Sequence, residues 1–408
     1  MQQWLDYALN YAYGVFPMSF WGYVLTSFLL VQVTMMAVTV YLHRDAAHRS
    51  LDLHPVLRHF FRFWIWSTSG MLTREWVAVH RKHHAMCEKE GDPHSPQVFG
   101  LKKVLLEGAE LYQDECKNTE TIDKYGRGCP NDWMERNIYT RYRNAGIILC
   151  VLSYLVLFGV PGIVLIAVQM IAMPLFAAGV INGIGHHTGY RNFECDDAAR
   201  NIVPWGLICG GEELHNNHHA FPTSAKFSMR PWEFDLGWMY IRIFSAFGLA
   251  KVNKVAPEPV RSHSEAAPDL DTLRAIIVNR MHVLRDYTRQ VTLPVFKGER
   301  LQAAASGRAS QLWRRAKKLV VRQPALLDDA SRERLAALLD SNTSLATVHQ
   351  FKLRLQELWS GAQNVSNERL LASLREWCAE AEASGINALQ EFAATLRGYA
   401  MATTPVRG

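Results

Sequence analysis

The stretch SFWGYVLTSFLLVQVTMMAVTVYLH, residues 19–43, contains no acidic or basic side chain before its final histidine. A helix needs about 20 consecutive apolar residues to cross the hydrocarbon core of a bilayer, which is about 30 Å thick. The stretch therefore predicts a membrane-spanning helix over residues 19–42, with His43 at the membrane surface. The segments that follow can then be assigned to one face of the membrane or the other.

A second uncharged stretch covers residues 145–182 and is interrupted by Gly-Val-Pro-Gly at 159–162. It is too long for one span, and the Pro-Gly turn near its middle predicts a helical hairpin with spans at about 145–160 and 163–182. A hairpin returns the chain to the face from which it started. His186, just after the second span, is therefore expected beside the residues that precede the hairpin.

Residues 55–72 are largely apolar but include Arg58, His59 and Arg62. Charged side chains make a full span expensive, so this segment is predicted to be an amphipathic helix lying in the membrane interface. The first seventeen residues are rich in Tyr and Trp but shorter than a span, so the sequence predicts three membrane helices, or four if the N-terminus inserts. Basic side chains predict that the loops between the spans are cytoplasmic. They are Arg44, Arg49, Arg74, Arg81, Lys82, Lys102 and Lys103.

The chain changes character after residue 255. Residues 256–268 form a polar, proline-containing linker, and residues 269–408 have Leu and Ala at helical spacing with abundant Arg and Glu. We predict an all-α integral membrane protein: residues 1–255 form a membrane domain with a cytoplasmic helical cap over its site, and residues 269–408 form a soluble helical appendage of unknown role. The net charge of +6 is mild and forms no dense basic arm, so no nucleic-acid partner is expected. Seven cysteines without a C-x2-C pair argue against a disulfide framework and a zinc ribbon.

Nine of the sixteen histidines fall in four short windows next to the apolar segments. The windows hold His43 and His48; His80, His83 and His84; His186, four residues after Asn182; and His215, His218 and His219. On a helix, residues i and i+3 share a face and i+4 lies beside it, so H-x2-H-H can give one imidazole to one metal and two to its neighbour. The i, i+5 spacing of the first window suits a helix end that unwinds slightly. Nine imidazoles exceed what one metal can hold, so two metals are predicted.

The other histidines stand alone and are assigned no ligand role, although His187 could compete with its neighbour His186. The isolated ones are His54, His59, His94, His263, His282 and His349. Nearby carboxylates could orient the ligands by accepting the second N–H of a ring. These are Asp45, Glu88, Asp92, Glu212 and Glu213, of which Glu88 is expected to be an ordinary solvated loop charge. Ligation by imidazole alone disfavours copper storage and structural zinc, and favours iron that reacts with dioxygen.

The segments HRDAAHRS, HRKHHAMCEKEGDPHSP, NGIGHHTGYRN and GEELHNNHHAFP resemble, in this order, the histidine boxes of membrane fatty-acyl desaturases of the stearoyl-CoA desaturase type. The resemblance covers residues 18–255, and within the family the chain is most similar to bacterial acyl-CoA Δ9 desaturases. It implies that the nine histidines bind two ferrous irons and that Asn182 acts on one iron through water. It further implies that dioxygen and two electrons are used to place a cis double bond in a saturated acyl chain carried by CoA. The site would lie at the cytoplasmic face of the bacterial inner membrane, in contact with membrane lipid.

Two further expectations concern electrons and chain length. The sequence contains no haem-binding His-Pro-Gly-Gly and no cysteine cluster, so electrons are expected from a separate ferredoxin-like protein, small cytochrome or flavin reductase. Basic side chains would steer that donor. They are Arg44, Arg81, Lys82, Lys102 and Lys103. Stepping back from His43 in turns of 3.6 residues gives a face that would either line the acyl tunnel or pack against the hairpin. That face holds Thr39, Met36, Gln32 and Phe28.

Two other functions fit parts of the pattern. A diiron membrane hydroxylase of alkanes, sterols or carotenoids uses similar boxes, but the four residues inside the first box, and Asn-x3-His followed by Gly-Tyr-Arg, favour a desaturase. A non-catalytic, histidine-rich membrane protein that binds or moves metal would place its ligands inside the spans along a path, whereas these histidines follow the ends of apolar segments.

Overall fold

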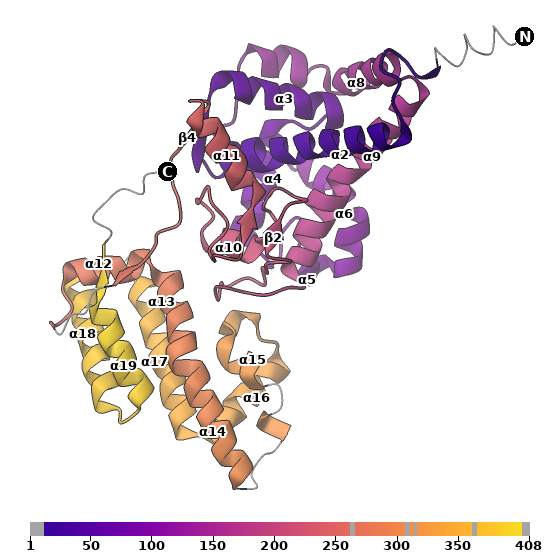
Figure 1. Ribbon diagram of the computed structural model, residues 1–408. Coiled ribbons are helices and arrows are strands. Elements are labelled where there is room, and N and C mark those ends of the chain that lie inside the picture. The colour runs from indigo at the N-terminus through magenta and orange to yellow at the C-terminus, as the bar shows by residue number, and fades with distance from the viewer. Residues whose placement is uncertain (1–11, 262–265, 307–310, 314–315, 361–364, 402–408) are drawn as a thin grey trace, which may run out of the picture. The chain divides into compact units, whose positions relative to one another are not determined.

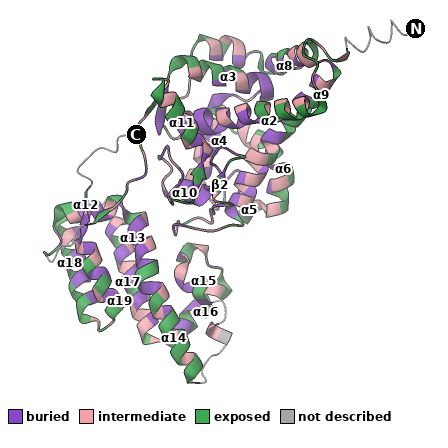
Figure 2. Ribbon diagram, in the orientation of Figure 1, coloured by how far each residue is buried: buried purple, intermediate pink, exposed green. Residues whose placement is uncertain are grey.

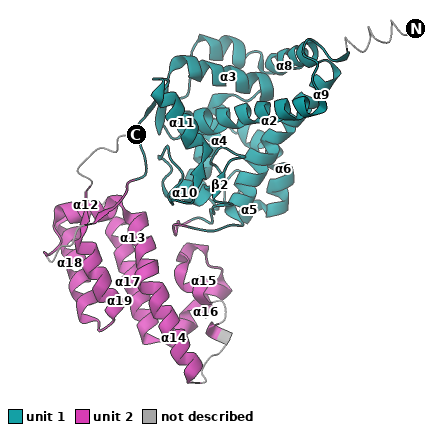
Figure 3. Cartoon of the chain, in the orientation of Figure 1, with its two compact units in different colours: residues 1–191, 197–256, 408 teal, residues 192–196, 257–407 magenta. Residues whose placement is uncertain are grey.

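The structure is a computed structural model that describes residues 12–261, 266–306, 311–313, 316–360 and 365–401 (Figure 1). The chain forms two compact units (Figure 3). The first comprises residues 1–191 and 197–256, and the second comprises residues 192–196 and 257–407. The short segment 192–196 therefore belongs to the second unit although it interrupts the first in sequence.

Two long apolar helices organise the first unit, and both have the length and composition to cross a membrane: Phe20–Ala47 and Val160–His186. The helix before the second one, Arg143–Phe158, is apolar but shorter, and it packs along it as a hairpin partner. Their elements are α2 (Phe20–Met36) with the π-helix η1 (Ala37–Ala47), α8 (Arg143–Phe158), and α9 (Val160–Met173) with the π-helix η3 (Pro174–Ile181) and the 3-10 turn η4 (Ile184–His186). Figure 2 shows much of the surface of α2, α8 and α9 as exposed, which fits apolar helices that would face lipid. The number of spans stays a prediction.

Helix α3 (Pro55–Ser69) covers most of the segment predicted to lie in the membrane interface. Gly70 ends it with a φ of 65°, the left-handed conformation that glycine adopts without strain. Arg62, one of the charges that argue against a span, is buried and pairs with Asp132 at 2.5 Å and Glu135 at 2.9 Å. Its charge is therefore neutralised inside the protein. The helix still exposes apolar side chains, namely Val56, Phe60 and Phe63.

Shorter elements complete the first unit, and two of them, α4 and α10, carry six of the nine clustered histidines. They are β1 (Leu51–Leu53), α4 (Thr73–Met86), α5 (Pro96–Phe99), α6 (Leu101–Cys116), α7 (Thr119–Tyr125), η2 (Glu135–Tyr139), β2 (Trp205–Gly206), α10 (His215–Ala220), β3 (Phe234–Asp235), α11 (Leu236–Ala246) and β4 (Ala250–Val252). Strand β1 pairs antiparallel with β4, and β2 pairs parallel with β3. The main apolar core of this unit lies beside η1 and α3. It includes Val40, Tyr41, Phe61, Ile65 and Ile241.

The described residues of the second unit are mostly helical, with one short strand pair. Its helices are α12 (Leu270–Val278), α13 (Arg280–Tyr287), η5 (Thr288–Thr292), α14 (Leu293–Ala305), η6 (Gln311–Trp313), α15 (Ala316–Val321), η7 (Pro324–Leu326), α16 (Asp329–Asp340), α17 (Thr343–Ser360), α18 (Asn367–Ala383) and α19 (Asn387–Arg397). Strands β5 (Val260–Arg261) and β6 (Tyr399–Ala400) pair antiparallel. One apolar core joins α12, α13, η5, α17, α18 and α19, with Trp377, Leu374, Phe392 and Tyr287 almost fully buried. A second core packs α14, α15 and α16 against the start of α17.

Candidate metal centre

The first histidine window lies on η1, and the π-helix explains its spacing. A π-helix closes its hydrogen bonds between residues i and i+5, and the His48 N–H donates to the His43 carbonyl at 3.0 Å. One π-turn therefore separates the two histidines and brings their ring centroids to 4.9 Å. The sequence suggested a helix end that unwinds slightly. The structure instead has a wider helix, a π-helix, over the whole of Ala37–Ala47.

Helices α4 and α10 divide their histidines between two groups. The first group combines His43 and His48 with two histidines of α4 and one of α10: His80, His84 and His218. Their metal-facing nitrogens all lie within 4.8 Å of one another. The Nε2 atoms of His43 and His218 are 3.1 Å apart, those of His48 and His80 2.8 Å, and those of His84 and His218 2.9 Å.

The second group forms around His186, at the end of the apolar helix Val160–His186. Its Nε2 lies 3.2 Å from the Nε2 of His83 and 2.9 Å from the Nε2 of His215. The ring of His219 completes the group, with its centroid 4.7 Å from that of His186 and 4.5 Å from that of His215. Each H-x2-H-H motif thus gives one imidazole to one group and two to the other. The Cys87 thiol lies at the edge of this group, 3.9 Å from the Nε2 of His83.

These spacings fit metal ions. Nitrogen ligands about 2.1 Å from one cation lie about 3 Å apart when they subtend a right angle, close to the separations within both groups. The Nε2 of His219 is buried without a hydrogen-bond partner among the described residues, so its lone pair is left for a metal. Burial also lowers the pKa of His80, His84, His215 and His218 well below the ordinary value. These rings are therefore neutral, the form that binds metals.

Four carboxylates hold the outer nitrogens of four histidines, and this orients the inner nitrogens toward the groups. His43 Nδ1 lies 2.7 Å from Glu212, and His83 Nδ1 lies 3.0 Å from Asp92. In the second group, His186 Nδ1 lies 3.0 Å from Glu88, and His219 Nδ1 lies 2.9 Å from Asp197. Asp92 and Glu212 match the prediction. Glu88 was expected to be solvated, but its side chain is only 8% exposed, so that expectation is wrong.

Two other carboxylates do not orient any histidine. Asp45 pairs with Arg58, with Oδ1 at 2.6 Å, and accepts the Leu53 N–H at 3.1 Å. Glu213 accepts backbone N–H groups from the loop before it, those of Ile208, Cys209 and Gly211. Both carboxylates stabilise loops next to the site, and their predicted contact with ligands is wrong. Asp197 was missed, because no sequence spacing connects it to His219.

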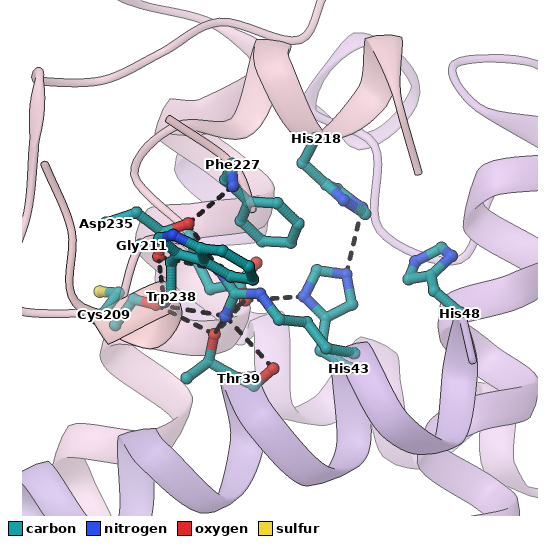
Figure 4. Close-up of polar contacts among 12 residues, drawn as sticks. Thr39, His43, His48, Cys209, Gly211, His218, Phe227, Asp235 and Trp238 are labelled. Carbon is teal, nitrogen blue, oxygen red and sulfur yellow. Dashed lines mark hydrogen bonds and ion pairs between the residues drawn. The ribbon is translucent and has the colours of Figure 1, made fainter. Parts of the chain in front are cut away.

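Arg44 contacts Glu212 and Asp235 beside the first histidine group. Its side chain is fully buried, its Nη2 donates to Asp235 Oδ1 at 3.0 Å, and its Nη1 lies 3.6 Å from Glu212 Oε1. Figure 4 shows His43 facing His218, with Phe227 and Asp235 next to them. The Arg44 guanidinium also stacks 3.7 Å from the centroid of Phe227. Gly211 has a φ of 97°, and a Cβ there would overlap the Asp235 carboxylate, so only glycine fits. The ion pair with Arg44 keeps the Glu212 carboxylate in a position where it can accept a hydrogen bond from His43 Nδ1.

The isolated histidines divide as follows. His187 is exposed and bonds to Thr188 Oγ1 at 2.8 Å, so it does not compete with His186. His54 accepts the Val56 N–H at the start of α3, His59 is exposed, and His282 and His349 lie in the second unit. His263 lies outside the described residues. His94 is buried, with its ring centroid 4.5 Å from that of His83, so it adjoins the centre without having been predicted there.

A cavity of about 590 Å³ opens onto both groups. His43, His80, His215, His94 and Asn182 line it at the metal end. Its other walls come from α3, α4, α6, α8 and η3 and include Gly70, Trp76, Ala109, Ile147, Met173 and Ala177. The rim carries polar and charged side chains: Gln113, Lys117, Arg143 and Asn144.

The face of residues 28–39 predicted to line the tunnel does not line this cavity. Thr39 donates to the Gly210 carbonyl at 3.1 Å, Gln32 donates to the Ile208 carbonyl at 3.4 Å, Met36 packs in the apolar core, and Phe28 is exposed. Val38 lines it instead. Val38 precedes His43 by five residues, one turn of a π-helix, whereas the prediction assumed turns of 3.6 residues.

The fold and the site define a helical protein with a histidine-rich centre, fit for two metals, at the end of a long cavity. Residues 18–256 match the family model for fatty acid desaturases, which covers more than half of the chain, so the chain belongs to the fatty acid desaturase family. The family predicted from the histidine boxes is confirmed. The chain is accordingly an oxidoreductase of fatty acid biosynthesis, and its family and two apolar helices indicate membrane association.

Curated relatives share this family. The chain is 28% identical to Delta-9 acyl-lipid desaturase 2 of Arabidopsis thaliana, over 59% of this chain and 78% of the relative. It is 30% identical to the sn-1 stearoyl-lipid 9-desaturase of Synechocystis, over 58% and 74%, and 26% identical to an acyl-CoA 5-desaturase of Anemone leveillei, over 60% and 75%. Residues 249–404 also match a family model described as a transposase, over less than half of the chain.

Proposed function

We propose that the protein is a diiron desaturase that inserts a cis double bond at the Δ9 position of a saturated acyl chain carried by CoA. One observation carries the proposal: two groups of histidines, one of five and one of four, lie next to each other at the end of one cavity. Bound iron would supply the reduction of dioxygen. The balance is one –CH2–CH2– unit, O2, two electrons and two protons giving –CH=CH– and two waters.

The nine histidines would divide as the geometry divides them, five to one iron and four to the other. The second group has one ligand fewer, and we assign the remaining contact to Asn182 acting through water, because Asn182 lines the same end of the cavity. The carboxylates Glu212, Asp92, Glu88 and Asp197 keep their histidines in one tautomer and one orientation. The protein itself holds the acyl chain and excludes water from the centre.

The cavity would hold the acyl chain, and its rim would face the carrier. Lys117 and Arg143 at the rim pair with Asp114 and Glu75. Both cations would exchange these carboxylates for phosphate oxygens of the carrier. Phosphate is common to CoA, the prosthetic group of acyl carrier protein and phospholipids. Relatives named for acyl-lipid and for acyl-CoA substrates both occur, so the assay must compare all three carriers.

Electrons would come from a separate redox protein docking on the cytoplasmic face of a bacterial inner membrane. The basic surface that steers it is smaller than the sequence suggested. Arg44 is fully buried, Arg81 donates to four backbone carbonyls, and Lys82 pairs with Glu115 at 2.9 Å. Lys102 and Lys103 on α6 are exposed and remain available for steering.

The test is expression in a host that lacks desaturases, followed by iron analysis and mass spectrometry of lipids. We expect about two irons per purified chain and cis-Δ9 monounsaturated products. Purified enzyme with an added electron donor should then be offered stearoyl-CoA, stearoyl acyl carrier protein and stearoyl phospholipid. Hydroxylated products would support the hydroxylase alternative, metal binding without product would support the non-enzymatic alternative, and turnover with NAD(P)H alone would refute the separate donor.

A further inference from the structure

Segment 192–196 is anchored in the second unit by one aromatic side chain. Phe193 is 1% exposed. Its ring meets that of His282 edge-on, with centroids 5.2 Å apart, and the Arg285 guanidinium lies 5.7 Å from its centroid. A phenylalanine buried in this way contributes a large share of the apolar contact available to a five-residue segment.

Backbone contacts of the same segment add to this anchor. The Glu194 carbonyl accepts from Gln323 Nε2 at 3.0 Å. Gln323 is itself buried and held by Gln356, whose Nε2 donates to Gln323 Oε1 at 2.9 Å. The conformation of the segment is therefore fixed by His282, Arg285 and Gln323, the last of which follows Glu194 by 129 residues.

The residues directly after the segment, in the first unit, orient two ligands of the second histidine group. Asp197 Oδ2 contacts His219 Nδ1 at 2.9 Å. The Ala198 N–H donates to Glu88 Oε1 at 2.8 Å, and the same oxygen contacts His186 Nδ1 at 3.0 Å.

Arg191 closes the base of the loop. Its Nη1 donates to the carbonyls of Asp197 and Ala199, at 2.7 and 3.1 Å. Residues 191 and 197–199 thus hold a fixed geometry in the first unit while the five residues between them belong to the second.

We propose that the second unit is a positioning element for the four-histidine metal position. By holding Phe193 and Glu194, it limits the conformations of the 191–199 loop, so that Asp197 and Ala198 stay in place to orient His219 and His186. Without this anchor a loop lacking regular structure would sample many conformations, and ordering it again would cost conformational entropy. Phe193 and Gln323 are then positioning residues that never touch the metal. The proposal rests on the proposed two-metal function.

The test uses the full chain, loaded with ferrous iron, and the substitution Phe193→Ala. Partners of metal ligands typically change metal affinity by about 10–100-fold. We therefore expect one of the two irons to be lost to a chelator about 10-fold faster or more, while the other is retained. Mössbauer spectra of 57Fe-loaded protein should show the loss in one of the two iron environments. Asp197→Asn should give the same spectral change, and the conservative Phe193→Leu should largely restore the native loss rate.

Three controls separate positioning from loss of folding. Leu301→Ala removes an exposed leucine of the same unit and should leave iron loss unchanged. Trp377→Ala weakens the core of the unit without touching the segment, so at temperatures where the unit stays folded it should keep both irons. Gln323→Ala provides a milder lesion should Phe193→Ala fail to fold. Native iron-loss rates in folded Phe193→Ala and Gln323→Ala would overturn the inference, whereas fewer than two irons in the unsubstituted chain would overturn the proposed function instead.

Discussion

The two units bury different kinds of side chain. The first buries most of the nine clustered histidines together with Glu212, Asp92 and Arg44, whereas the core of the second is made of leucine, aromatic and alanine side chains around Trp377. Bringing unpaired imidazoles together out of water costs free energy, which a bound metal must offset. Apolar packing instead stabilises the fold directly. Truncating a clustered histidine of the first unit should therefore remove the chemistry, whereas truncating a core side chain of the second unit should lower its stability.

The largest effect is expected for His218→Ala. His218 contacts both His43 and His84 through Nε2, so its loss should remove the iron of the first group and reduce desaturation below detection. Melting of the apo protein should change little, because the loss of packing against Phe227 is offset by removal of a buried imidazole that no metal binds. His187→Ala, an exposed histidine next to His186, is the matched control. Residual turnover above a few per cent would argue that five ligands are not required.

Trp377→Ala should do the reverse. Truncating a buried tryptophan costs about 3–5 kcal/mol, and Trp377 is 1% exposed, with its indole N–H donating to the Phe351 carbonyl at 2.9 Å. Thermal unfolding of the second unit should shift downward accordingly. Desaturation measured at a temperature where this unit is still folded should be retained. If Trp377→Ala also lost desaturase activity at a temperature where the second unit is folded, the two units would not differ in this way.

Within the first unit, Asp92→Asn should weaken binding of one metal without unfolding the protein. Burial alone would raise the pKa of Asp92, but the charge and hydrogen bond of His83 lower it to about 2, so the carboxylate is ionised at neutral pH. Replacing it should reduce iron affinity by about 10–100-fold, measured by competition with a chelator. Asp114→Asn, at an exposed carboxylate, is the neutral comparison. Equal affinities would show that the Asp92 contact does not orient His83.

The cavity offers a change in product rather than in rate. Ile147, on α8, lines the cavity beside Gly70, which precedes the start of α4. His80 lies about 10 Å along α4 from its first residue, at 1.5 Å per residue. Ile147→Trp should shorten the acyl chains that are accepted and leave the double-bond position unchanged, as gas chromatography of the products would show. Phe28→Trp, on a face that the sequence offered as one wall of the tunnel but that does not line the cavity, should not alter chain length.

The smallest effect concerns Lys352, a buried lysine of the second unit. Burial lowers the pKa of Lys352 to about 8, whereas an exposed lysine titrates near 10.4. Between these values the unfolded chain binds a proton that the folded chain does not, so stability of the second unit should rise from about pH 8 to pH 10. Lys352→Met should abolish this slope in thermal unfolding experiments. A slope that persists in the variant must belong to another group.

The sequence predicted what depends on local spacing. Apolar length located both long helices, and histidine spacing identified all nine residues that the structure brings together. Contacts across the fold were beyond it. Asp197 lies 22 residues before His219 in an irregular loop, and the burial of Glu88 depends on Ala198, which is 110 residues away. The sequence left the rotation of the first helix open. The face counted back from His43 does not line the cavity because a π-helix advances its faces differently from an α-helix, and composition does not distinguish the two.

That π-helix has a consequence for engineering. Stabilisation programmes often replace irregular segments by ideal ones, and deleting Ala46 would convert H-x4-H into the H-x3-H spacing that an α-helix places on one face. The shortened helix should be more stable to heat, because π-helical turns occur mainly where function requires them. It would move His48 away from His80, however. Thermal stability would therefore rise while metal binding falls. The eleven residues of η1 are thus a segment in which a gain in heat tolerance predicts an inactive enzyme.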